Sequence, residues 1–157
     1  MWYLMIRIHK GLYSPQLLNN NPEQYFVFGD NTQGYGRGGQ ACIRGLPNAI
    51  GLPTKVSPGM DPDDFFDDAH CGDWYDVAMQ PAFKRICTLL DSNNLIAVPA
   101  DGLGTGLALL PQKAPKLYNL MMVTFYFIVE EVGLQNKQET LDTIFYKDML
   151  NAYEQLR

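Results

Sequence analysis

Two glycine-rich segments, each preceded by a short run of apolar residues, constrain this fold more than any other feature of the chain. The first segment, residues 29–40, follows the apolar run 25–28, and the second, residues 99–107, follows the run 95–98. Continuous apolar runs of this length are typical of strands buried on both faces in a parallel sheet. Glycine takes up positive φ and lets the backbone approach a ligand closely. The pattern therefore predicts two buried strands, each with a glycine-rich loop at its carboxyl end.

Two further strands are expected, at residues 2–8 and at residues 47–53. The second is expected at an edge of the sheet, because prolines stand at both of its ends. Strands that alternate with helices indicate an α/β layered fold with a largely parallel central sheet. Ligands of such sheets bind beyond the carboxyl ends of the strands, where both glycine loops are expected to lie.

Helices are expected between these strands and after them. Ser14 is a good N-cap and Pro15 a good first helical residue, so a short helix is predicted to open there. The other helical stretches are residues 38–44, 74–90 and 114–132. The tail, residues 139–156, is expected to be helical or mixed, with residues 143–146 as an alternative strand.

The helix expected at residues 74–90 carries an apolar stripe at helical spacing. Pro81 is expected either to kink this helix or to mark a new start. The stripe consists of Val77, Phe83, Ile86, Cys87 and Leu90.

Composition limits the class of protein. A chain of 157 residues that is 46% hydrophobic predicts one globular domain, residues 1–157. The net charge of −5 argues against affinity for duplex nucleic acid, which requires clustered Lys and Arg. No apolar run approaches the roughly 20 residues that span a bilayer, and the N-terminus lacks the features of a signal peptide. We therefore expect a cytoplasmic protein without a membrane partner.

Metal and disulfide chemistry are not expected. The 3 cysteines are widely spaced and form no CxxC pair, and only 2 histidines are present. His70 and Cys71 adjoin an aspartate-rich segment, residues 61–76, which is interpreted as a solvated loop and helix start. The sequence thus predicts no metal site and no bound cofactor.

The two loops carry the candidate ligand-binding residues. Successive exposed backbone N–H groups form a concave anion site, and the amide of an Asn offers both donor and acceptor to sugar hydroxyls. The candidates in the first loop are Gly29, Asp30, Asn31, Tyr35, Gly36, Arg37, Gly38, Gly39 and Gln40. Those in the second loop are Asp101, Gly102, Leu103, Gly104, Thr105, Gly106 and Leu107. Lys55 is a further cation that points either at this cleft or at solvent.

The first loop contains a formal GxGxxG, which opens the alternative of a Rossmann-type dinucleotide-binding protein. That motif requires a strand immediately before the first Gly and an acid at the end of the next strand. Residues 30–33 intervene here, and the next candidate strand ends at Thr54-Lys55 without a carboxylate. The motif is therefore a poor match.

A different family accounts for both loops together. A strand followed by Gly-Asp-Asn and then by Gly-x-Gly-Gly-Gln-Ala resembles the first ligand loop of macro domains, and Gly104-Thr105-Gly106-Leu107 is similar to their Gly-Cys-Gly-Leu variant. The resemblance implies a three-layer α/β/α sandwich that binds ADP-ribose or a related NAD-derived nucleotide. It further implies that Asn31 contacts the distal ribose and that residues 102–106 embrace the diphosphate.

The resemblance implies binding more directly than hydrolysis of ADP-ribosyl linkages. Gln40 and Ala108 stand where many hydrolytic macro domains carry Asp. Asp101 and Asp30 are the substitute candidates for a general base, with Asn31 positioning the ribose. A non-enzymatic reader, sponge or sensor of the nucleotide remains an alternative. So does a domain that binds a protein partner through its acidic segment.

Overall fold

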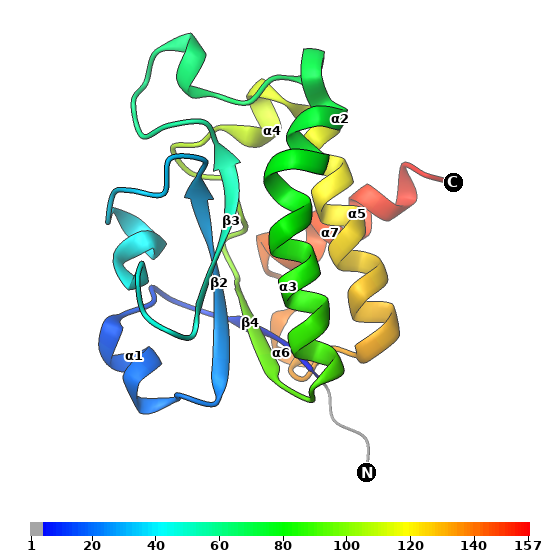
Figure 1. Ribbon diagram of the computed structural model, residues 1–157. Helices are drawn as coiled ribbons and strands as arrows, with labels where there is room; N and C mark the ends of the chain where they lie inside the picture. The colour runs from blue at the N-terminus through cyan, green and yellow to red at the C-terminus, as the bar shows by residue number, and fades with distance from the viewer. Residues whose placement is uncertain (1–4) are drawn as a thin grey trace.

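The computed structural model describes residues 5–157 and shows a four-stranded sheet in which every strand pair is parallel. The strand order is β1-β4-β2-β3. The strands are β1 (Ile6–His9), β2 (Gln24–Asn31), β3 (Ala49–Lys55) and β4 (Leu95–Pro99). Since all strands run the same way, their carboxyl ends and the loops that follow them meet at one edge of the sheet (Figure 1).

Helices cover both faces of this sheet, which makes the fold a three-layer α/β/α arrangement. One face carries the longer helices α3 (Gln80–Asp91), α5 (Pro115–Val132) and α7 (Ile144–Glu154), and the other carries α1 (Pro15–Asn20) and a 3₁₀ helix, Gly39–Ile43 (Figure 1). The shorter α-helices are α2 (Cys71–Asp73), α4 (Leu110–Lys113) and α6 (Lys137–Thr140). Two 3₁₀ helices, Pro62–Asp64 and Asp68–His70, and a π-helix, Trp74–Met79, are also present. The expected α/β class and parallel sheet are confirmed.

Strand periodicity divides the core into two parts. On β2, Phe26 and Phe28 pack into the smaller core under α1, whereas Val27 packs into the larger core under α3 and α5. Ala97 and Val98 on β4 divide in the same way. Both central strands are therefore buried on two faces, as their unbroken apolar runs predicted.

Local sequence rules located most elements correctly. Ser14 caps α1 by accepting a hydrogen bond from Leu17 N, and α5 ends before Gly133 as expected. A strand was expected at residues 2–8. Residues 2–4 of that range lie outside the described part of the chain, and in the described part β1 runs from Ile6 to His9. The short helix expected at 38–44 is present as a 3₁₀ helix.

The tail is helical, as expected, and the alternative strand at residues 143–146 is wrong, because Thr143 is the N-cap of α7 and accepts a hydrogen bond from Tyr146 N. One further expectation was wrong. The apolar stripe on the helix at 74–90 does not include Val77, which is 75% exposed, or Cys87, which is also exposed. Pro81 has no N–H to bond the carbonyl of Val77, and the preceding turn, Trp74–Met79, is a π-helix that rotates the following residues relative to an ideal α-helix.

Part of the acidic segment is structural. Asp68 accepts hydrogen bonds from the main-chain amides of Lys116 (3.0 Å) and Leu117 (3.1 Å) at the start of α5. Asp61 and Asp64 form a capping box around the short 3₁₀ helix Pro62–Asp64. These carboxylates satisfy helix amides that would otherwise lack acceptors.

Candidate functional site

A cavity of about 750 Å³ lies at the carboxyl edge of the sheet, with both glycine loops in its walls. The loops meet where β2 and β4 end: a Cβ added to Gly29 would lie 3.8 Å from the amide nitrogen of Gly104. The cavity is lined by most of the predicted residues, namely Gly29, Asp30, Asn31, Tyr35, Gly36, Gly38, Gly39, Gln40, Asp101, Gly102, Gly104, Thr105, Gly106 and Leu107. Two segments that are distant in sequence therefore share one site.

Asn31 organises the first loop from within. Its Nδ2 donates to the carbonyl of Tyr35 (2.8 Å), and its Oδ1 accepts from the amides of Gln33 (3.1 Å) and Gly34 (3.0 Å). This is an Asx-type turn, in which the side chain takes the place of backbone partners. One N–H of the Asn31 amide remains for a ligand.

Asp30 is held in an ion pair that the sequence did not predict. Arg44 Nη1 lies 2.6 Å from Asp30 Oδ1, and the two side chains are only 14% and 15% exposed. Arg44 also donates to the carbonyls of Gly36 (2.8 Å) and Tyr35 (3.3 Å), so one guanidinium ties the loop to the end of β2. Because a partner already engages its carboxylate, Asp30 is poorly placed to act as a general base.

Three of the predicted ligand-binding residues are buried in the core or hydrogen-bonded within the protein. Arg37 is not among the cavity-lining residues, and its Nη1 donates to the carbonyl of Arg44 (2.9 Å). Leu103 is buried in the core. Gln40 lines the cavity, but its Oε1 accepts from Tyr13 N (2.6 Å) and its Nε2 donates to Gly11 O (3.3 Å).

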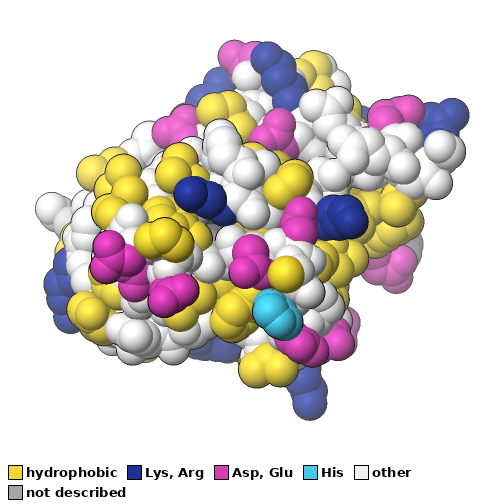
Figure 2. All heavy atoms as spheres, turned by 90° about the horizontal axis from the view of Figure 1, so that it is seen from above, with side chains coloured by type: hydrophobic (Ala, Val, Ile, Leu, Met, Phe, Trp, Pro, Cys, Tyr) yellow, Lys and Arg dark blue, Asp and Glu magenta, His cyan; other side chains and the backbone are white. Residues whose placement is uncertain are grey.

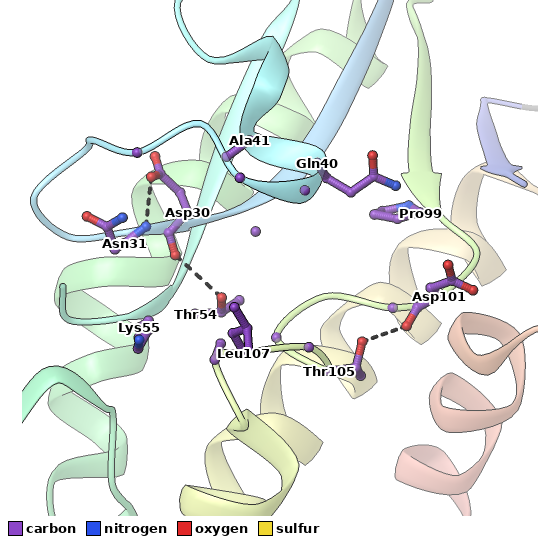
Figure 3. A pocket seen from close by; sticks show the side chains of 18 of the residues that line it. Asp30, Asn31, Gln40, Ala41, Thr54, Lys55, Pro99, Asp101, Thr105 and Leu107 are labelled. Carbon is purple, nitrogen blue, oxygen red and sulfur yellow. Dashed lines mark hydrogen bonds between the residues drawn. The ribbon is translucent and has the colours of Figure 1, made fainter. Parts of the chain in front are cut away.

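The second loop depends on glycine geometry. Gly104 has φ +76°, and a Cβ there would lie 2.8 Å from Leu110 Cβ and 3.1 Å from Thr54 Cβ. Thr105 Oγ1 donates to the main-chain carbonyl of Asp101 (2.5 Å) and closes the turn. The Asp101 side chain is exposed at the cavity, on the second loop (Figure 3). It has no hydrogen-bond or ion-pair partner among residues 5–157.

Both loops present consecutive main-chain amides without acceptors. Within residues 5–157, the N–H groups from Tyr35 to Gln40 and from Leu103 to Ala108 make no intramolecular hydrogen bond. Runs of free amides in glycine-rich turns are the chemistry by which proteins hold phosphate oxygens.

β3 and the cavity rim add residues outside the two loops. Thr54 and Lys55 line the cavity from the end of β3, and Lys55 is buried, with its Nζ directed at the carbonyls of Pro58 and Gly59 rather than at solvent. Asp30, Asn31 and Lys55 lie toward one end and Gln40, Pro99 and Asp101 toward the other (Figure 3). Exposed apolar side chains stand at the rim: Leu12, Tyr35, Leu107 and Ile144.

Viewed from above, this face shows Lys and Arg side chains scattered singly among apolar and acidic ones (Figure 2). No group of three or more His, Cys, Asp or Glu residues suited to a metal ion is present in residues 5–157. Within the same residues, no helix is long and apolar enough to cross a membrane.

A protein-family model described as a family of unknown function (DUF7831) matches residues 8–124. The chain belongs to the DUF7831 family. The part matched by the DUF7831 model holds all four strands except the first residues of β1, together with both glycine loops, Arg44 and Lys55. No curated protein and no solved structure matches the chain.

Proposed function

We propose that this protein binds ADP-ribose or a related NAD-derived nucleotide between its two glycine loops. The observation that supports this most directly is the convergence of two runs of free amides on one cavity. The cavity volume lies within the range of about 300–1,000 Å³ that is usual for ligand sites. The macro-domain resemblance of the two loops remains a prediction that agrees with this proposal.

A Rossmann-type dinucleotide site is less well supported. The first glycine loop opens a short 3₁₀ helix rather than a full α-helix, and β3 ends at Lys55 rather than at an acid. The Rossmann fingerprint needs both a helix N-terminus for the pyrophosphate and a carboxylate for the ribose.

Hydrolysis of an ADP-ribosyl linkage is a second candidate, carried by Asp101. Its carboxylate lies at the cavity with no partner among residues 5–157, whereas that of Asp30 is paired with Arg44. A free carboxylate within reach of the ligand is able to accept a proton from an attacking water. Without such a step, the protein acts as a reader, sponge or sensor of the nucleotide.

Calorimetry with ADP-ribose tests binding, and two glycines give a selective block. A Cβ at Gly38 or Gly106 would meet no atom of residues 5–157 within 4 Å, and neither residue has positive φ. Gly38→Val and Gly106→Val are therefore expected to fill part of the cavity with little strain. Each is expected to weaken binding at least about tenfold while leaving the free energy of unfolding within about 1 kcal/mol. Gly72→Val is the matched control, since Gly72 is equally open but lies outside the cavity.

Incubation with ADP-ribosylated protein or DNA tests the chemical step. Asp101→Asn is expected to abolish release of ADP-ribose with little loss of affinity if Asp101 is the base. Binding without release in the unmodified protein would leave the non-enzymatic alternative. Absence of ADP-ribose binding, with the protein folded, would refute the proposal itself.

A further inference from the structure

Lys55 is a charged side chain in a setting that usually excludes charge. It is only 7% exposed, yet it lines the cavity at the end of β3. Its Nζ donates to the carbonyls of Pro58 (3.2 Å) and Gly59 and lies 4.5 Å from the centre of the Phe65 ring. All of these partners are neutral, so they orient the ammonium without cancelling its charge.

No carboxylate within residues 5–157 forms an ion pair with Lys55. The pKa of nearby Asp64 is lowered, mainly by the hydrogen bond from Ser57 and then by that from the Asp61 amide, with a smaller effect from the charge of Lys55. The oxygens of Asp64 accept from those two groups rather than from Lys55. Buried charges are normally paired. Asp64 lies close enough for Lys55 to lower its pKa, but no carboxylate of residues 5–157 makes a direct ion pair with Lys55, so part of this positive charge is left beside the cavity.

Lys55 also holds one wall of the cavity in place. Residues 56–64, here called the strap, are closed by Asp64 at one end and by the bonds from Lys55 to Pro58 and Gly59 in the middle. Pro58 lines the cavity, and its Cγ lies 4.0 Å from the position of a Cβ on Gly36. The strap therefore stands against the first glycine loop, and Lys55 helps to hold it there together with Asp64.

We infer that Lys55 is the specificity-determining residue of the site, selecting ligands that carry phosphate over the corresponding neutral nucleosides. The inference deepens the proposed function and rests on the same cavity. The Lys55 ammonium donates its hydrogen bonds to the strap carbonyls, so its charge acts on the ligand through space. Solvent screens this charge less at a buried position than at the surface. The free amides of the two loops supply the direct hydrogen bonds.

Affinity measurements on charge variants test this inference. Lys55→Gln keeps an N–H donor for the strap carbonyls but removes the charge, and Lys55→Arg keeps the charge. Lys113→Gln is the matched control, because Lys113 also lies over Phe65 (5.0 Å), is exposed and does not line the cavity. The probes are ADP-ribose, inorganic pyrophosphate and adenosine, measured by calorimetry, with urea unfolding of each variant as a check on the fold.

Lys55→Gln is expected to bind ADP-ribose and pyrophosphate about tenfold or more weakly, with adenosine changed less than twofold. Lys55→Arg and Lys113→Gln are expected to stay within about threefold of the unmodified protein for every probe. Unchanged phosphate binding by Lys55→Gln would overturn the inference. An equal loss for adenosine would overturn it too, since that result would indicate damage to the strap alone.

The same experiment separates this inference from the proposed function. Binding of pyrophosphate but not of ADP-ribose would refute the proposed function and still test Lys55 through pyrophosphate. Binding of ADP-ribose that does not depend on the charge of residue 55 would refute only the role of Lys55. Failure of the folded protein to bind either phosphate compound would refute both.

Discussion

Gly51 on β3 leaves the space that the Asp30 carboxylate occupies. A Cβ on Gly51 would lie 2.3 Å from Asp30 Oδ2 and 3.0 Å from its Cγ. The carboxylate is unable to turn aside freely, because its Oδ1 accepts from Asn31 N (2.7 Å) and pairs with Arg44 (2.6 Å). Gly51→Ala is therefore expected to break the contact between Asp30 and Arg44.

The size of the effect follows from these contacts. A hydrogen bond to a charged group contributes about 1.5–3 kcal/mol, and the small remaining exposure of this pair reduces that value somewhat. Replacing Gly by Ala where the backbone permits it returns about 0.4–1 kcal/mol through the unfolded state. Gly51 has no positive φ, so we expect Gly51→Ala to lower the free energy of unfolding by about 1–2 kcal/mol.

A double-mutant cycle with Asp30→Ala, followed by urea unfolding, isolates the cause. In the Asp30→Ala background the obstructing carboxylate is gone, and Gly51→Ala is expected to cost less than about 1 kcal/mol. Gly38→Ala is the matched control, because its Cβ would meet nothing within 4 Å and the substitution should be neutral or slightly stabilising. Equal costs for Gly51→Ala in both backgrounds would refute the reasoning.

Three further predictions concern stability and pH. Asp68→Ala removes the carboxylate that caps α5 and is expected to cost about 1–2 kcal/mol in urea unfolding. Asn136→Ala removes a side chain that both accepts from Ile8 N (3.0 Å) and donates to Ile8 O (2.7 Å) along the outer edge of β1, and is expected to cost about 1–3 kcal/mol by the same measurement. Burial, and then the charge of Arg7, lowers the pKa of His9, so the folded state favours the neutral ring. The free energy of unfolding should therefore decline as the pH falls below the pKa of about 6.5 that His has in the unfolded chain. His9→Gln should flatten that decline in thermal unfolding scans.

Each of these has a result that contradicts it. An exposed acid of the same segment, changed in Asp73→Ala, should cost almost nothing; a cost equal to that of Asp68→Ala would mean that net charge rather than capping is responsible. Full stability of Asn136→Ala would show that water replaces its bonds to β1. An unchanged pH profile in His9→Gln would assign the acid sensitivity to other groups.

Local sequence patterns located the central strands and the two loops. The apolar runs of β2 and β4 need only their own residue types to indicate burial on two faces, and the expected edge position of β3 follows from its prolines. The caps at Ser14 and the end of α5 before Gly133 likewise depend on neighbours within one helical turn.

Contacts between distant residues were not predictable in this way. No sequence motif relates Arg44 to the glycine loop that precedes it, and only the folded chain shows that Arg44 pairs with Asp30. The role of Asn31 was expected toward a ligand, whereas most of its hydrogen-bonding groups serve the loop itself. Val77 faces solvent rather than the core because of the π-helical turn that precedes Pro81, and that turn was not predicted from the sequence.

The sequence by itself determined which segments become strands and that two of them end in loops rich in free amides, because these properties depend on residue type and short-range spacing. Only the tertiary structure decided that β4 lies beside β2, that Gly29 therefore meets Gly104, and that Lys55 is buried with no ionic partner among residues 5–157. Such outcomes depend on how the packed layers bring distant segments together, and no local preference encodes that geometry.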